Sequence, residues 1–141
     1  MTISDAIILL CSILGLSISL YFTLVYYRLI KPDATFVPKF CRLDEATCQY
    51  LMSTRNARIL GARNFVLGLL YYSVLILYVT LVSLQQTISF EFVAGISLFT
   101  VLLGIYLVYG LIVKLKTHCL LCYTSHALNL IIFLSLIMKA R

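Results

Sequence analysis

Four long apolar runs divide the chain, and each is long enough to cross a membrane as a helix. They extend over about residues 6–27, 65–84, 92–113 and 119–138. A helix needs about 20 apolar residues to cross the roughly 30 Å hydrocarbon core of a bilayer. Charged residues lie between these runs and not within them. The pattern predicts an all-α membrane protein with a single domain over residues 1–141.

The segments between the runs predict how the helices are connected. Residues 85–91 and 114–118 are short turns that make consecutive helices antiparallel neighbours, whereas residues 28–63 form a longer linker. Within this linker, Asp44 is suited to cap a short half-helix from Glu45 to about Met52. With four crossings, the linker and the 114–118 turn lie on the same side. We therefore expect an antiparallel four-transmembrane-helix bundle with a cysteine-bearing linker and a short half-helix between helices 1 and 2.

Composition and charge agree with a membrane location. Hydrophobic residues make up 62% of the chain and charged residues 11%, against about half and a quarter in soluble proteins. The net charge of +6 comes from basic residues beside the spans, which points to lipid headgroups and not to nucleic acid. The first run lacks a basic leader and an A-x-A site, so we expect it to be retained. A multi-pass protein of a plasma or inner membrane is expected.

Small and polar residues near the spans indicate specific helix contacts. Gly15 and Ser19 are four residues apart in the first span, a spacing that lets a neighbouring helix approach closely. Asn64 precedes the second span, where it is either a helix cap or a hydrogen-bond donor aimed into the bundle. Cys11 is interpreted as a small buried hydrophobe.

The other four cysteines form two pairs on one side of the predicted bundle. Cys41 and Cys48 lie in the linker, and Cys119 and Cys122 open the last span. A Cys-x-x-Cys sequence at a helix start places two thiols one turn apart, where the helix dipole favours the thiolate. Two such pairs can relay electrons by thiol–disulfide exchange, and a pair at the bilayer edge can pass them to a lipid-soluble quinone.

Other interpretations of the cysteines remain open at this point. Either pair could be a static disulfide, or the thiols could bind a metal, alone or with His118 and His126. A covalent c-type haem is disfavoured, because Tyr123 stands where a C-x-x-C-H motif has its histidine. In the redox interpretation, Lys114 and Lys116 are expected to favour the anion of Cys119 together with the helix dipole.

The order of these motifs resembles the vitamin K epoxide reductase family and its bacterial and archaeal homologues. The resemblance extends from the first span to Asn129. It is carried by Cys41, Cys48, Ser53-Thr54, Asn64-Phe65-Val66-Leu67-Gly68, and Cys119-Leu120-Leu121-Cys122 with Ala127 and Asn129.

The resemblance implies a role for each motif. Cys122 is implied to lie next to the quinone ring and Cys119 to exchange with Cys48, while Cys41 faces a thioredoxin-like or other dithiol partner. Asn64 is implied to hydrogen-bond a quinone carbonyl. The quinone would be ubiquinone, menaquinone or a related compound. A membrane thiol:quinone oxidoreductase that supports disulfide formation is therefore the predicted function, and the alternative is a non-enzymatic maturation subunit with structural disulfides or a metal site.

Two departures from the family's pattern stand out. His126 replaces the tyrosine that animal enzymes carry four residues after the second cysteine, and it is expected to donate to the second carbonyl. Many microbial relatives have a fused thioredoxin-like domain. This sequence shows no such domain up to Arg141, so the protein partner is expected to be a separate chain.

Basic residues predict which side of the membrane the cysteines face. The cysteine side carries nine, and only Lys139 and Arg141 lie opposite. Positive residues in short loops favour the cytoplasm, which predicts a cytoplasmic cysteine side. The family resemblance implies the extracytoplasmic side instead. The nine residues are Arg28, Lys31, Lys39, Arg42, Arg55, Arg58, Arg63, Lys114 and Lys116.

Overall fold

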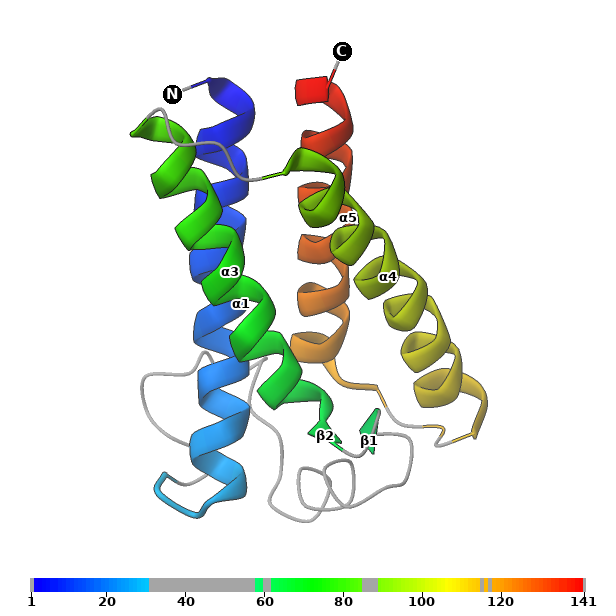
Figure 1. Ribbon diagram of the computed structural model, residues 1–141. Helices are drawn as coiled ribbons and strands as arrows, with labels where there is room; N and C mark the ends of the chain where they lie inside the picture. The colour runs from blue at the N-terminus through cyan, green and yellow to red at the C-terminus, as the bar shows by residue number, and fades with distance from the viewer. Residues whose placement is uncertain are drawn as a thin grey trace.

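The computed structural model describes residues 2–30, 58–59, 62–84, 89–114, 116 and 118–140. Its helices are α1 (Ile3–Tyr26), α3 (Asn64–Ser83), α4 (Phe90–Tyr109) and α5 (Leu120–Ala140), and a π-helical turn, η3 (Gly110–Lys114), continues α4. The four long helices alternate in direction, so the two termini lie at one end and the start of α5 at the other (Figure 1).

The predicted all-α architecture with four spans is confirmed. Each helix is long and apolar enough to cross a membrane, with α4 and η3 forming one span from Phe90 to Lys114. The observed boundaries lie within three residues of the predicted ones. Cys41, Cys48 and the predicted half-helix from Glu45 to Met52 lie outside the described residues.

The start of α1 is fixed by polar contacts that extend the helix beyond its apolar run. Thr2 and Asp5 form a capping box, in which the Asp5 N–H donates to Thr2 Oγ1 at 3.2 Å and the Thr2 N–H donates to the carboxylate at 2.9 Å. Lys139 Nζ donates to the same carboxylate at 2.5 Å. This ion pair joins the first turn of α1 to the last turn of α5 at the end that carries the termini.

The opposite end of α1 stops at a left-handed residue. Arg28 has φ 58°, and the N–H groups of Arg28 and Leu29 donate to the carbonyls of Val25 and Leu24. These bonds form a Schellman motif, which satisfies the last carbonyls of the helix. Nearby, the Arg63 guanidinium lies 4.0 Å from the centre of the Tyr26 ring.

A short antiparallel ladder precedes α3 and was not predicted from the sequence. Strand β1 (Arg58–Ile59) pairs with β2 (Ala62–Arg63), with Arg58 opposite Arg63. Two-residue strands do not produce a readable alternation of apolar and polar positions, so the sequence pattern could not reveal them. The ladder lies at the end of the bundle where α5 begins (Figure 1).

Close contact between α1 and α3 confirms the prediction made from Gly15 and Ser19. A Cβ atom added to Gly15 would lie 2.2 Å from the Tyr72 ring, and one added to Gly68 would lie 2.6 Å from Ser19 Oγ. Only glycine at these positions leaves room for the facing helix. The ring of Tyr72 thus occupies a notch in α1 beside Gly15.

The helix packing leaves a space between α3 and α4. Helix α1 packs against α3 and α5, and α5 packs against α4. In the described part of the chain α3 and α4 make little direct contact, although Tyr71 Oη on α3 donates to Ser97 Oγ on α4 at 3.0 Å. The prediction that these two consecutive helices are antiparallel is correct, but they are not neighbours packed along their length.

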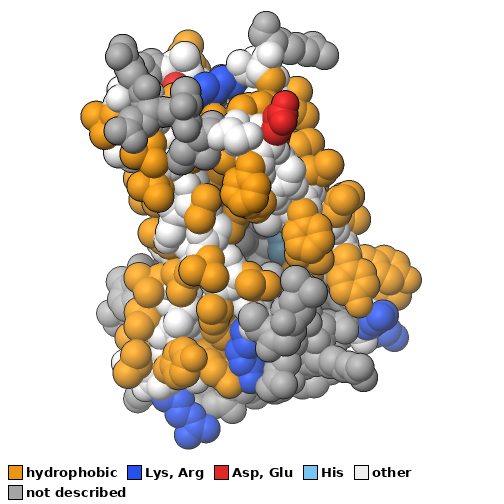
Figure 2. All heavy atoms as spheres, viewed as in Figure 1, with side chains coloured by type: hydrophobic (Ala, Val, Ile, Leu, Met, Phe, Trp, Pro, Cys, Tyr) orange, Lys and Arg blue, Asp and Glu red, His pale blue; other side chains and the backbone are white. Residues whose placement is uncertain are grey.

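The outer surface of the bundle is apolar in its middle and charged at its ends. Figure 2 shows hydrophobic side chains covering the middle of one face, with Lys and Arg side chains near its ends. Among the described residues, five basic ones belong to the cysteine end, whereas the end with the termini has one basic and two acidic residues. The first group is Arg28, Arg58, Arg63, Lys114 and Lys116, and the second is Lys139, Asp5 and Glu91.

Candidate functional site

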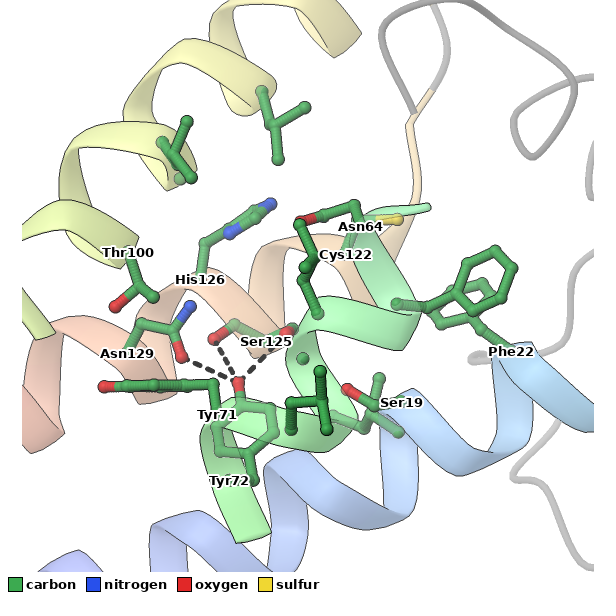
Figure 3. A pocket seen from close by; sticks show the side chains of 18 of the residues that line it. Ser19, Phe22, Asn64, Tyr71, Tyr72, Thr100, Cys122, Ser125, His126 and Asn129 are labelled. Carbon is green, nitrogen blue, oxygen red and sulfur yellow. Dashed lines mark hydrogen bonds between the residues drawn. The ribbon is translucent and has the colours of Figure 1, made fainter. Parts of the chain in front are cut away.

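A pocket of about 340 Å³ lies between the four helices, on the side where α3 and α4 separate. Its walls are mainly aliphatic and aromatic side chains. The polar residues that line it include Asn64 on α3 and four residues of α5, which are Cys122, Ser125, His126 and Asn129. Figure 3 shows these side chains around the cavity, and histidine atoms are visible inside the hollow of Figure 2.

The spacing of the α5 residues explains why they meet at one wall. Positions 122, 125, 126 and 129 are separated by three or four residues, so they share one face of the helix. The first of them lies near the start of α5, and Asn64 is the first residue of α3, which runs in the same direction. Asn64 and Cys122 therefore lie at the same end of the pocket (Figure 3).

The pocket opens toward the lipid-facing surface between α3 and α4. Leu70 on α3 and Phe99 on α4 line the pocket, yet they are 63% and 50% exposed. Side chains that both line a cavity and face outward form its rim. Because this rim is apolar and lies within the membrane spans, it connects the pocket with the hydrocarbon part of the bilayer.

Asn64 is not the cap of α3, so the first of the two interpretations of the sequence is wrong. The capping position is occupied by Arg63, with no side-chain hydrogen bond to the helix. Asn64 follows as the first helical residue and lines the pocket. Its amide group is therefore available to a bound molecule.

The two cysteines of the Cys-x-x-Cys sequence have different surroundings. Cys119 is 0% exposed and packs among Tyr21, Val25 and Leu111, whereas Cys122 is partly exposed and lines the pocket. Neither is in a disulfide. A molecule in the pocket can reach Cys122, while the sulfur of Cys119 can be attacked only by a group held inside the protein.

Cys119 stands immediately before α5 and caps the helix through its sulfur. The Cys122 N–H donates to Cys119 Sγ at 3.2 Å, and the Tyr123 N–H donates to the Cys119 carbonyl at 3.1 Å. The Cys122 side chain, together with the N–H groups of Cys122 and Leu121, lowers the pKa of the Cys119 thiol, although burial acts in the opposite direction. The first turn of α5 thus favours the thiolate, and the Cys122 side chain makes the largest contribution.

The contact that the structure shows for Lys114 is with an aromatic ring and not with Cys119. The Lys114 ammonium lies 5.9 Å from the centre of the Tyr106 ring, and neither Lys114 nor Lys116 is among the groups that lower the pKa of Cys119. A flexible lysine side chain near an aromatic ring at the membrane surface gains cation–π contact there. Stabilisation of the Cys119 anion comes from the start of α5 itself.

His126 lies deeper in the pocket, against Gly104 of α4. A Cβ added to Gly104 would lie 3.0 Å from His126 Nδ1, and this nitrogen is buried without a hydrogen-bond partner in the described part of the chain. An unpaired buried N–H is costlier than an unpaired lone pair, which favours the neutral tautomer with its proton on Nε2. In that tautomer His126 can donate through Nε2.

Tyr72 connects α3 to the pocket wall of α5, a contact that the sequence did not reveal. Its hydroxyl donates to Asn129 Oδ1 at 2.7 Å and lies 3.2 Å from Ser125 Oγ. Helical spacing was the available signal, because Tyr72 follows Asn64 by two turns and Asn129 follows Cys122 by two turns. The pairing itself depends on how the two helices are rotated, which spacing does not give.

The part of the chain that the structure describes contains no cluster of side chains that could bind a metal ion. Within those residues, no three His, Cys, Asp or Glu side chains gather closely enough to hold an ion. His118 Nδ1 lies 3.2 Å from the Tyr123 hydroxyl, outside the pocket, whereas His126 lines it. His118 and His126 therefore do not form a shared metal site in the described structure.

Comparison with known protein families matches residues 6–137 to the vitamin K epoxide reductase family. The chain belongs to this family. The match includes most of the first and last spans, all of the other two and both described cysteines of the site, which agrees with the resemblance carried by the motifs. Members of the vitamin K epoxide reductase family are oxidoreductases of thiol–disulfide and quinone chemistry. No curated protein matches the chain.

Proposed function

We propose that this protein is a membrane thiol:quinone oxidoreductase. It takes electrons from a thioredoxin-like or other dithiol partner through Cys41 and Cys48, relays them to Cys119 and Cys122, and passes them to a quinone. The observation that carries the proposal is the position of Cys122, whose side chain lines a pocket that opens to the lipid. The net result is disulfide formation in client proteins.

A quinone suits both the polarity and the shape of the pocket. The volume of about 340 Å³ lies in the range of small-molecule sites, and aliphatic and aromatic walls suit a ring. Among the described lining residues, the amide and imidazole groups lie on α5 and at the start of α3. The apolar rim at Leu70 and Phe99 gives an isoprenoid tail a route into the membrane. Ubiquinone, menaquinone and related quinones share these features.

Asn64 and His126 would hold the two ring carbonyls. Asn64 is the amide donor at the level of Cys122, and His126 is a donor through Nε2 about 6 Å further along α5. Both donors strengthen their hydrogen bonds as the oxygens gain negative charge, which favours reduction.

The proposed redox cycle balances in electrons and protons. A bound quinone accepts two electrons and two protons and leaves as a hydroquinone, while the Cys119 and Cys122 thiols become a disulfide. Exchange with the Cys41–Cys48 dithiol then restores the two thiols. The resulting Cys41–Cys48 disulfide is reduced in turn by the dithiol of the partner, which becomes oxidised.

The burial of Cys119 supports an internal relay. A thiol in the aqueous phase has no path to a sulfur that is 0% exposed, so reducing equivalents reach it from another cysteine of the same chain. The lowered pKa of Cys119 makes it the better leaving group of a mixed disulfide. Exchange between Cys48 and Cys119 uses this property.

The charge distribution favours a cytoplasmic position for the cysteine end. The five basic described residues at that end are accompanied by no acidic described residue. At the other end, the one basic residue that the structure describes, Lys139, is neutralised by its ion pair with Asp5. Positive residues near span ends are retained in the cytoplasm. Disulfide formation in the cytosol is known in hyperthermophiles, and such a compartment would suit this orientation.

Reduction of quinone by single-cysteine variants tests the proposal. Cys122→Ala should abolish quinone reduction, whereas Cys41→Ala should block electron entry from the partner and leave Cys119 and Cys122 able to reduce one equivalent of quinone. Cys11→Ala is the matched control, because Cys11 is buried away from the pocket lining. Normal turnover by Cys122→Ala would refute the assignment.

Thiol trapping separates the proposal from a structural role of the cysteines. In a thiol:quinone oxidoreductase, the cysteines shift between alkylated and protected states when dithiol or quinone is added. Permanent pairing, or thiols released only by a chelator, would instead support a non-enzymatic maturation subunit.

A further inference from the structure

The deep end of the pocket contains a polar cluster that the proposed cycle does not use. Tyr72, Ser125 and Asn129 meet within the membrane-spanning part of the bundle, where polar side chains are costly unless they are paired or functional. Asn129 is only 8% exposed, and its side chain lines the pocket. At this depth both the oxygen and the nitrogen of the amide need hydrogen-bond partners.

The oxygen of the amide is committed to Tyr72. Tyr72 is 1% exposed, and its ring is fixed in the notch beside Gly15. Its hydroxyl has a single proton, and Asn129 Oδ1 at 2.7 Å is a nearer acceptor for it than the Ser125 carbonyl at 3.4 Å. Ser125 Oγ lies 3.2 Å from the same hydroxyl and can donate to it, which leaves the phenolic proton for Asn129.

The nitrogen of the amide is thereby turned toward the cavity. Because the two polar atoms of an amide point in different directions, an oxygen held by Tyr72 places Nδ2 on the other side. Figure 3 shows the Asn129 nitrogen on the side away from Tyr72 and toward His126. In the described part of the chain Nδ2 has no hydrogen-bond partner, so its two protons are available to a ligand.

We propose that Asn129 is a substrate-binding residue whose amide nitrogen donates to the quinone oxygen held by His126, and that Tyr72 is the positioning residue that aims it. His126 and Asn129 are three residues apart on one face of α5, and a carbonyl oxygen has two lone pairs. Two donors on one oxygen, with Asn64 alone on the other, bind the ring in one orientation. This inference rests on the proposed function.

The test compares Tyr72→Phe, Asn129→Leu and the double variant in the full-length protein reconstituted in lipid nanodiscs. A short-chain ubiquinone and a simple naphthoquinone are the probes, and the one that the wild type reduces faster is used. Tyr72→Phe keeps the ring in the Gly15 notch and removes only the hydroxyl. Tyr78→Phe is the matched control, since Tyr78 is buried in the same helix and does not line the pocket.

Loss of one neutral hydrogen bond corresponds to about a two- to tenfold effect on binding. We expect Asn129→Leu and Tyr72→Phe each to raise the KM for quinone within that range, with the exchange between dithiol and protein unchanged. Since Tyr72 acts through Asn129, the double variant should be no worse than Asn129→Leu. Tyr78→Phe should match the wild type.

The possible failures are distinguishable. An active wild type with an unchanged KM in Asn129→Leu would refute the binding role of Asn129. Effects that multiply in the double variant would show that Tyr72 acts independently and overturn its positioning role. If Asn129→Leu does not fold, a wild-type KM in Tyr72→Phe refutes the inference by itself. If the wild type reduces neither quinone, the proposed function is wrong and this inference falls with it.

Discussion

Gly104 of α4 lies directly against the ring of His126. A methyl group at this position would stand 3.0 Å from His126 Nδ1, closer than ordinary contact. Gly104→Ala should therefore push the ring away from its place beside the pocket and misplace Nε2. Steady-state assays should show a loss of quinone kcat/KM of about ten- to a hundredfold, because a displaced donor loses most of its stabilisation of the reduced oxygen.

Gly95 provides the control for this substitution within the same helix. Nothing in the described part of the chain lies within 4 Å of a Cβ added there, so Gly95→Ala adds a methyl group without a clash. Gly95→Ala should keep wild-type activity. An equal loss in both variants would mean that helix propensity, and not the position of His126, determines the effect.

The notch beside Gly15 should be sensitive to any side chain. In Gly15→Ala the new Cβ would lie 2.2 Å from the Tyr72 ring, so α1 and α3 must separate or the ring must move. Overpacking of this kind costs about 1–3 kcal/mol. We expect a lower thermal unfolding temperature in detergent for Gly15→Ala than for Gly95→Ala. An unchanged unfolding temperature would contradict the close approach of the two helices.

The pH dependence of thiolate formation should reveal the helix-start effect on Cys119. Because its pKa is lowered, Cys119 in the reduced protein should deprotonate below the pH of an ordinary thiol. The ultraviolet absorbance of the thiolate can follow this in a variant that retains only Cys119 and Cys122. Adding Cys122→Ala removes the largest stabilising contact, so the transition should move to higher pH. Identical transitions would show that the Cys122 side chain has no such effect.

The membrane orientation can be measured with reporters at the C-terminus. Helix α5 ends on the side of the bundle opposite Cys119 and Cys122, so a cytoplasmic cysteine end places the C-terminal end of α5 outside the cytoplasm. A C-terminal alkaline phosphatase fusion should be active, and a fusion to a fluorescent protein that matures only in the cytoplasm should be dark. The reverse pair of results would place the cysteines outside the cytoplasm.

Features carried by single helices were predictable, and contacts between distant helices were not. The apolar runs gave the four spans because the bilayer selects for length and hydrophobicity alone. Gly15 and Ser19 predicted the close approach of a second helix, because small residues four positions apart let two membrane helices pack closely. Helix α1 begins three residues before the predicted apolar run, and the charge of Asp5 in its first turn is paired. Its partner Lys139 lies 134 residues away.

The same limit applies to the site. Cys122, Asn64 and His126 were singled out by type, spacing and family resemblance, and the structure brings all three to the pocket. The contacts of Gly104 with His126 and of Tyr72 with Asn129 depend on how α3, α4 and α5 are rotated about their axes. Spacing shows which residues share a face of one helix, but it does not specify which residues of another helix that face meets.

The apolar rim between α3 and α4 determines how ligands of this protein should be compared. A molecule that enters from the bilayer is presented to the pocket at its mole fraction in lipid and not at its concentration in water. Two inhibitors with the same contacts to Asn64 and His126 would then differ in apparent potency by the ratio of their partition coefficients. Phospholipid chains compete for the same opening, so the apparent KM depends on the lipid-to-protein ratio of the preparation.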